Sequence, residues 1–358
     1  MRGGGAGSPG EITPRTGAFA NRGSPAARHP TAVLIGDIHR GGVIASIAGT
    51  FDILPEEDRA RLKAFLINKF HGDPDLFSEG RSFLEQHTRT PCLGIVPHFA
   101  DARSLPAEDA VALEETLAST SNGLKISVLR LPRIANFDDL DPLRLEPGVS
   151  LSFVQPGEAI PGDARLVIIP GSKSTIADLA ALRREGWDID LRAHVRRGGL
   201  VLGLCGGYQM LGRRISDPDG LEGAAGSTEG LGLLDAETTL LADKTLTRIS
   251  GTHVPTGAGV HGYEIHLGRT DGPACARPFA MLGGRADGAI STSGQVMGTY
   301  LHGCFGSDDF RRAFLGSLGV QASNLRFEET VERTLDGLAA HLEAHLDLGR
   351  LLSLAGDV

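Results

Sequence analysis

The sequence predicts an α/β protein with two domains, each built around a parallel β-sheet. Three observations lead to this fold class. Short apolar runs alternate with amphipathic helical segments, many of the 49 glycines stand at the ends of those runs, and 358 residues suffice for about two domains. Strands that alternate with helices at this spacing form right-handed parallel crossovers.

The first series of strands lies in the N-terminal third of the chain. The predicted strands of this series are the apolar runs at 32–36, 64–68 and 92–96. The helical patterns between and after them lie at 43–54, 77–87 and 107–118. Residues 1–30 are rich in Gly, Pro and Ser, a composition typical of loops. We therefore expect a first domain over residues 1–118.

A second series of strands begins after a polar segment at 119–124. The predicted strands of this series are the buried runs at 125–131, 149–154, 166–169 and 200–204. Helical segments at 174–184 and 187–197 separate the last two of these strands. Further strands without long helices between them are expected to be antiparallel, and they lie near 231–240, 248–254, 261–268 and 295–301. This pattern predicts a second domain over 124–318. Residues 319–358 predict a helical tail, and the leucines on one face of its helix are Leu335, Leu338, Leu342 and Leu346.

The composition excludes several classes of function. The chain carries 35 basic and 44 acidic residues, a net charge of −9, so we expect no nucleic-acid partner. No apolar run is long enough to cross a bilayer, and the N-terminal residues lack the apolar stretch of a secretory signal, so we expect a cytoplasmic protein with no membrane partner. Four cysteines without Cys-x-x-Cys spacing disfavour a disulfide framework or a zinc site and leave a catalytic thiol as an interpretation.

Cys205 stands where a buried strand turns into a helix. The run at 200–204 leads directly into Cys205-Gly-Gly-Tyr-Gln-Met-Leu-Gly212, and a turn of small residues there projects the side chain out of the sheet. The helix N-terminus favours the nucleophilic thiolate, and the N–H groups of Gly206 and Gly207 can bind a developing oxyanion. A buried structural cysteine is the alternative, but the turn favours a catalytic nucleophile.

A base for this thiol is predicted at the end of another strand. Gln295-Val-Met-Gly-Thr-Tyr-Leu301 delivers His302-Gly303 to the same edge of the sheet as Cys205. A histidine there accepts and returns a proton near neutral pH. Alone, His302 would more often be a structural histidine, but beside the cysteine turn it is predicted to be the general base.

A third strand ends in a Pro-Gly loop, Ile168-Ile-Pro-Gly-Ser-Lys-Ser-Thr175. Lys-Ser-Thr after a strand invites comparison with a phosphate-binding loop, but that motif requires glycine directly before the lysine, where Ser172 stands. We therefore expect Gly171 and Ser172 to supply a second oxyanion N–H, in addition to that of Gly206.

Together these motifs resemble those of the cobyric acid synthase family, the glutamine-dependent amidases of the cobalamin pathway. The resemblance rests on Pro-Gly-Ser-Lys-Ser-Thr, Gly-Leu-Cys-Gly-Gly-Tyr-Gln-Met-Leu-Gly, Gly-Tyr-Glu-Ile-His-Leu-Gly-Arg-Thr and Gly-Thr-Tyr-Leu-His-Gly, in this order. It extends to segments at 131–137, 37–42 and 67–73. It implies a partial dethiobiotin-synthetase-like nucleotide-binding domain followed by a class I glutaminase-like domain.

The resemblance also implies a reaction. Cys205 as nucleophile and His302 as base hydrolyse glutamine, and the ammonia amidates side-chain carboxylates of a corrinoid, adenosylcobyrinic acid a,c-diamide. Related glutaminases often have an acidic residue two positions after the histidine, where Cys304 stands here, so Glu264 is a candidate substitute or simply a carboxylate on the strand surface.

In the same family, ATP and Mg²⁺ are expected for the full reaction, with no tightly bound cofactor and no metal site of the chain's own. Asp37, Asn68 and Lys69 are the candidates for contact with the nucleotide or metal. A structural role for Asn68 as a cap is the alternative.

The N-terminal half departs from the family pattern. It contains no Gly-x-x-x-x-Gly-Lys-Ser/Thr motif, Gly4 replaces a glutamate of the family, and His39 replaces an aspartate. Weaker binding of phosphate and metal should follow. We therefore hypothesise an N-terminally truncated chain that retains the glutaminase without autonomous synthetase activity, through a mis-assigned start or a separate subunit that carries the phosphate-binding loop.

Two alternative functions remain open. The glutaminase could serve another acceptor, as in cobyrinic acid a,c-diamide synthase or the cell-wall amidating glutaminases. The chain could instead be a non-catalytic paralogue that binds a corrinoid or a partner subunit. The segments at 262–266 and 67–70 favour cobyric acid synthase over the first alternative, and the pair of Cys205 and His302 argues against the second.

Overall fold

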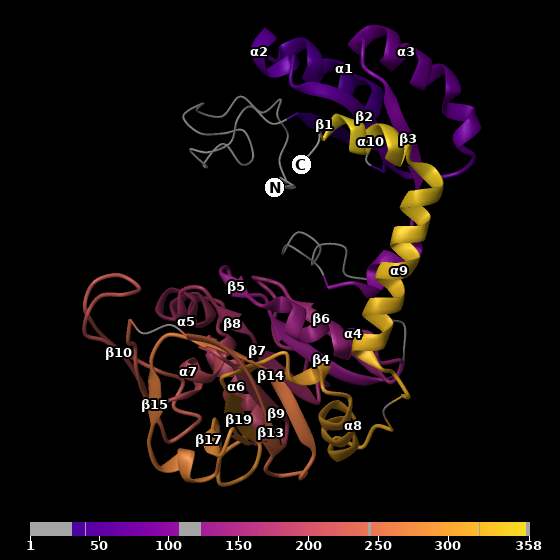
Figure 1. Cartoon of the computed structure of the whole chain (residues 1–358). Helices are drawn as coiled ribbons and strands as arrows, with labels where there is room; N and C mark the ends of the chain where they lie inside the picture. Colours follow the sequence, from indigo (N-terminus) through magenta and orange to yellow (C-terminus); the bar gives the residue numbers. More distant parts are fainter. Residues whose placement is uncertain (1–30, 40, 107–122, 243–244, 322, 356–358) are drawn as a thin grey trace. The chain divides into compact units, whose positions relative to one another are not determined.

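The computed structural model describes residues 31–39, 41–106, 123–242, 245–321 and 323–355, drawn in colour in Figure 1. These residues divide into two compact units, one holding those up to Ala102 and those from Arg333 on, the other holding Arg103–Glu332. Both units are built on a parallel sheet, so the predicted α/β class is confirmed. The predicted loop at 1–30, the helix at 107–118 and most of the boundary at 119–124 lie outside the described residues.

The first unit contains a three-stranded parallel sheet in the order β1-β2-β3. Its strands match the three predicted runs and are β1 (Ala32–Asp37), β2 (Leu62–Phe70) and β3 (Cys92–Pro97). The helical segments that connect them are α1 (Val43–Ile53), α2 (Glu56–Arg59), η1 (Pro74–Phe77) and α3 (Ser78–Thr88), and η2 (Ala100–Ser104) follows β3. Ile47 of α1 and Leu84 of α3 are buried against Phe65 and Ile67 on one face of the sheet.

The end of the chain covers the opposite face of this sheet. Helix α9 (Phe327–His345) contributes its last turns, and α10 (Leu348–Leu354) packs on β3. Leu342 and Leu346 contact Leu66 and Leu93 there. An amphipathic helix needs an apolar surface to cover, and the sheet provides one. Residues 319–358, predicted as a tail of their own, therefore divide between the two units, and Leu335 of the predicted apolar face is 44% exposed.

The second unit is built on a six-stranded sheet in the order β18-β19-β9-β7-β4-β6, parallel except for β18. Its strands are β4 (Leu124–Leu129), β6 (Val149–Val154), β7 (Leu166–Ile169), β9 (Leu200–Leu204), β18 (Ala289–Ile290) and β19 (Val296–Thr299). The strand predicted near 295–301 was expected to be antiparallel, and this is wrong. As β19 it is parallel to β9, because the preceding segment returns the chain to the edge of the sheet.

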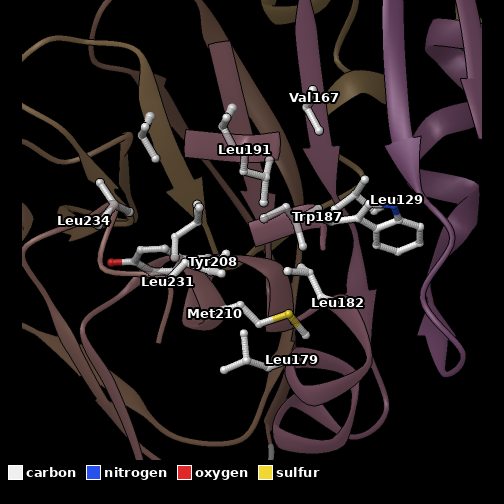
Figure 2. Packing of buried hydrophobic residues seen from close by; sticks show 14 of the residues in the cluster. Leu129, Val167, Leu179, Leu182, Trp187, Leu191, Tyr208, Met210, Leu231 and Leu234 are labelled. Atoms are coloured by element: carbon white, nitrogen blue, oxygen red, sulfur yellow. The ribbon is translucent and has the colours of Figure 1, made fainter. Parts of the chain in front are cut away.

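Helices cover both faces of this sheet. On one face lie α5 (Thr175–Arg184), α6 (Trp187–Arg196) and α7 (Gly206–Leu211). Figure 2 shows the core beneath them, where Trp187 and Met210 pack with Val167 of the sheet. On the other face lie η4 (Phe137–Leu140), α4 (Asp141–Arg144), η6 (Cys304–Gly306) and α8 (Asp308–Ser317). Phe305 and Phe310 fill the core there.

Three smaller sheets complete the unit, in the orders β11-β10-β12-β15, β17-β16-β13-β14-β20 and β5-β8. Their strands, with the turn η5, are β5 (Ile134–Ala135), β8 (Gly171–Ser172), β10 (Arg214–Asp217), β11 (Gly226–Glu229), β12 (Glu237–Thr239), β13 (Thr245–His253), β14 (Gly259–His266), β15 (Arg269–Asp271), η5 (Pro273–Ala276), β16 (Ala280–Leu282), β17 (Arg285–Asp287) and β20 (Leu301–His302). The antiparallel pair β13-β14 confirms the strands predicted at 248–254 and 261–268. None of the helices described is both long and apolar enough to cross a membrane.

A buried arginine connects α8 to the rest of the second unit. Arg311 is fully enclosed and donates hydrogen bonds to Oε1 of Glu146 and the carbonyl oxygen of Phe305 at 2.8 Å each. It also donates to Oδ1 of Asp308 and the carbonyl oxygen of Leu325 at 2.7 Å each. Two carboxylates and two carbonyl groups thus compensate the guanidinium charge, and the carboxylate of Glu146 is itself buried.

Replacing Arg311 by leucine should lower the free energy of unfolding by about 3–5 kcal/mol, because the carboxylate of Glu146 would remain buried without its counter-charge. Urea unfolding followed by circular dichroism measures the change. The control is Arg312→Leu, which removes a more exposed arginine from the same helix and should cost less than about 1 kcal/mol. Equal losses in the two variants would contradict the prediction.

Candidate active site

Cys205 lies at a strained turn between β9 and α7. Its backbone has φ 49° and ψ −107°, outside the regions that L-residues ordinarily occupy. Gly207 is required at this turn, because a Cβ there would lie 2.0 Å from the carbonyl oxygen of Ile169. The half-buried thiol lies 3.5 Å from the carbonyl oxygen of Ile265. The strand, tight turn and helix predicted around this residue are all present.

His302 lies beside Cys205. It ends β20, which begins two residues after the last residue of β19, and it is 2% exposed. Its ring interacts electrostatically with the Cys205 thiol, and its Nδ1 atom lies 2.7 Å from Oδ2 of Asp139. Because Nδ1 faces the carboxylate, Nε2 is the ring nitrogen that remains for the thiol. The structure therefore brings together the predicted nucleophile and the predicted base.

Asp139 is the residue of this site that the sequence reasoning missed. It lies in η4, is 3% exposed, and accepts a hydrogen bond from the backbone N–H of Gly303 at 2.5 Å through its Oδ1 atom. It precedes His302 by 163 residues, so no local spacing connects the two. The available signal was a pair of aspartates, Asp138 and Asp139, soon after the first strand of the second series.

Glu264, the predicted substitute for orienting His302, does not serve that role. Tyr263 is the residue of β14 that pairs with His302 of β20, and successive side chains of a strand point to opposite faces. Glu264 therefore points away from the ring. It is 5% exposed and forms an ion pair with Arg285. Of the two roles left open for Glu264, the register therefore disfavours the orienting one, and spacing from the histidine motif does not show which face of a neighbouring strand meets the ring.

The charges around His302 favour its protonated ring. Burial alone would lower the pKa of His302, but the charge and hydrogen bond of Asp139, followed by the hydrogen bond and charge of Cys205, raise it to about 10. The ring can thus hold a proton taken from the thiol while the carboxylate stabilises the resulting cation.

Gly171 and Gly206, the predicted oxyanion residues, lie close to these groups. A Cβ on Gly206 would lie 3.1 Å from the backbone nitrogen of Ser172, and one on Gly171 would lie 3.2 Å from Cε1 of His302. The hydroxyl of Ser172 donates to Oδ2 of Asp178 at 2.7 Å, which directs this side chain to the base of α5. The hydroxyl of Ser172 is therefore already engaged, and its backbone N–H is the group that this residue can offer to the site.

Asp37, Asn68 and Lys69 lie together in the first unit, where β1 and β2 end. Asp37 pairs with Asn68 in the sheet register, and Nζ of Lys69 donates to Oδ2 of Asp37 at 2.9 Å. Among the described residues, no group of three or more His, Cys, Asp or Glu side chains could hold a metal ion. One carboxylate oxygen of Asp37 is thus already bound by Lys69.

Comparison with known proteins places these features in a family. The model of the CobB/CobQ-like glutamine amidotransferase domain matches residues 125–310, which include Asp139, Cys205 and His302. The crystal structure of a glutamine amidotransferase resembles 55% of this chain over its own whole length, at 21% identity and a TM-score of 0.42.

Curated relatives match nearly the entire chain. The cobyric acid synthase of Jannaschia sp. (strain CCS1) is 57% identical over 350 residues, which are 98% of this chain and 72% of the relative. That of Paracoccus denitrificans (strain Pd 1222) is 57% identical over 351 residues, with the same coverage of both chains. The chain belongs to the cobyric acid synthase family.

The buried pair of His302 and Asp139 predicts how stability depends on pH. The pKa of His302 is about 10 in the folded chain, against an ordinary value of 6.5. Its stabilising contribution is therefore complete below about pH 6.5 and is lost as the pH rises towards about 10. The free energy of unfolding, measured with urea across this range, should fall accordingly.

Asp139→Asn should flatten this dependence, because the variant removes the charge that raises the pKa. Glu264→Gln is the control and should leave the dependence unchanged, since Glu264 does not contact the ring. A fall in stability that is as steep in Asp139→Asn as in the native chain would show that His302 does not owe its pKa to Asp139.

Proposed function

We propose that the second unit hydrolyses glutamine through a thioester on Cys205 and releases ammonia for an amidation. The observation that carries this proposal is that Asp139, His302 and Cys205 lie next to one another, in this order, where strands of the six-stranded sheet end. A nucleophile, a base within hydrogen-bonding reach and a group that orients the base are the components of nucleophilic acyl transfer. Membership of a family of glutamine-dependent amidases supports the same chemistry.

In the first half-reaction, the Cys205 sulfur, with its proton already held on Nε2 of His302, attacks the side-chain amide carbon of glutamine. The carbonyl π bond opens to an oxyanion, for which the backbone N–H groups of Gly206 and of the Gly171-Ser172 segment are the proposed donors. His302 then returns the proton to the amide nitrogen, the C–N bond breaks, and ammonia leaves. The glutamyl group remains on sulfur as a thioester.

In the second half-reaction, His302 accepts a proton from water, and the hydroxide that forms attacks the thioester carbon. The C–S bond breaks, the sulfur leaves as the thiolate opposite the protonated ring of His302, and glutamate is released. Asp139 acts through its carboxylate in both halves. Its carboxylate accepts the hydrogen bond from Nδ1, keeps Nε2 directed at the sulfur, and stabilises the imidazolium each time it forms.

We propose that the acceptor is a side-chain carboxylate of a corrinoid, adenosylcobyrinic acid a,c-diamide. The support is the set of cobyric acid synthases that match 98% of this chain. ATP with Mg²⁺ activates the carboxylate in this reaction, and the first unit is the proposed nucleotide-binding part. Asp37, Asn68 and Lys69 are candidates for contact with the nucleotide rather than ligands of the ion, because Lys69 already pairs with Asp37.

The native chain should release ammonia from glutamine, and Cys205→Ala should release none above background, because the thioester requires the sulfur. A coupled assay for glutamate measures the rate. A glutamine-analogue electrophile should label Cys205 in the native chain, as read by peptide mass spectrometry. Cys275→Ala removes another half-buried thiol and should retain the activity. Hydrolysis at the native rate by Cys205→Ala would refute the proposed nucleophile.

The proposed acceptor can be tested separately by equilibrium dialysis. Adenosylcobyrinic acid a,c-diamide should be retained by the native chain and by Cys205→Ala alike, because the acceptor does not contact the nucleophile. The visible absorbance of the corrin ring measures retention. Retention of a lipid-linked cell-wall precursor without retention of the corrinoid would assign the glutaminase to another acceptor.

A further inference from the structure

An aromatic ring lies flat against the ring of His302. Tyr263 of β14 pairs directly with His302 of β20, and the two ring centroids are 5.3 Å apart with an angle of 17° between the planes. The register of two neighbouring strands therefore places a tyrosine face on the imidazole. Asp139 contacts the same imidazole at Nδ1, and Cys205 interacts with it electrostatically.

The tyrosine is held in this position at its far end. Nδ2 of Asn136 donates a hydrogen bond to the Tyr263 hydroxyl at 2.9 Å. Asn136 has φ 51° and ψ 44°, a left-handed conformation that asparagine adopts more readily than most residues. It stands three residues before Asp139, so one short segment supplies both the carboxylate and the clamp on the tyrosine.

The backbone beside the histidine leaves room for this stack. Gly303 has φ 72°, and a Cβ at that position would lie 3.5 Å from Cε1 of Tyr263. The ring of Tyr263 thus covers His302 and the glycine that follows it, without an intervening side chain. The phenol remains protonated, because burial and then the nearby charges of Asp139 and Asp138 raise the pKa of Tyr263 well above its ordinary value.

A stacked tyrosine changes the energy of a cation more than that of a neutral ring. The face of an aromatic ring carries negative charge density, and a cation within about 6 Å of the centroid is attracted to it, more strongly when water is excluded. His302 is almost fully buried, and glutamine hydrolysis converts it repeatedly into an imidazolium. The other titratable groups that interact with it are Asp138, Asp139, Cys205 and His266.

We infer that Tyr263 is a positioning residue for His302, and that its ring face, clamped by Asn136, stabilises the imidazolium that stands opposite the Cys205 thiolate. Only the catalytic benefit of this role depends on the proposed glutaminase function. The stabilisation of the ion pair is a property of the resting site, so it can be measured without glutamine.

The test is the pH profile of alkylation of Cys205 by iodoacetamide, read at the Cys205 peptide by mass spectrometry. In Tyr263→Leu the onset of alkylation should move to higher pH by about 0.5–1 unit, because the imidazolium that favours the thiolate loses a stabilising contact. Tyr263→Phe retains the ring face but loses the hydroxyl that Asn136 binds, so its profile should fall between those of the native chain and Tyr263→Leu.

Turnover of glutamine provides a second readout. Tyr263→Leu should lower kcat by about three- to tenfold with little change in KM, since the tyrosine acts on the base rather than on the substrate. Asn136→Ala should fall between the native chain and Tyr263→Leu in both measurements, because the ring keeps its place in the strand but loses its clamp. Circular dichroism confirms that each variant is folded.

Each outcome decides the inference. Identical alkylation profiles for the native chain, Tyr263→Phe and folded Tyr263→Leu would overturn it, as would a Tyr263→Phe profile shifted as far as that of Tyr263→Leu. A shifted profile in Tyr263→Leu, with a native chain that hydrolyses no glutamine, would uphold the stabilised ion pair and refute the proposed function instead.

Discussion

The buried contact between Asp139 and His302 is the interaction on which the site depends. Each side chain is about as enclosed as a core leucine, at 3% and 2% exposure, so neither could remain charged there without the other. The carboxylate also binds the backbone N–H of Gly303, and thereby fixes both the ring and the chain that carries it. Because water does not reach these two side chains, neither the carboxylate nor the ring can move far without leaving the other charge uncompensated.

The parallel sheet explains why groups so distant in sequence meet. The segment with Asp139 follows β4, Gly171 follows β7, Cys205 follows β9, and His302 follows β19. All four strands are parallel members of one sheet, so their carboxyl ends lie at the same edge. The segment that follows β4 first forms β5, which pairs with β8, before it reaches the site at Asp139. The site is thus assembled from the loops at one edge of a rigid sheet.

The sequence predicts those site residues whose role depends on the residues next to them in the chain. Cys205 stands in a turn of glycines between strand and helix, and His302 ends a strand, so both could be predicted from a few neighbouring residues. Asp139 could not, because its partner is far away and nothing near it has a distinctive pattern. The role of Glu264 stayed open between two alternatives because register with β20, which decides the face that meets the histidine, is a tertiary property. The same limit applies to the leucines of α9, whose pattern shows an apolar face without showing what it covers.

The left-handed backbone at Cys205 has a consequence for the stability of the second unit. Holding a non-glycine residue there costs free energy of the order of 1–3 kcal/mol, and glycine alone would be relaxed at that φ and ψ. The thiol thus occupies a position where the backbone favours the one residue that has no side chain to react. The same turn that presents the sulfur beside His302 therefore makes the fold less stable than a glycine at this position would.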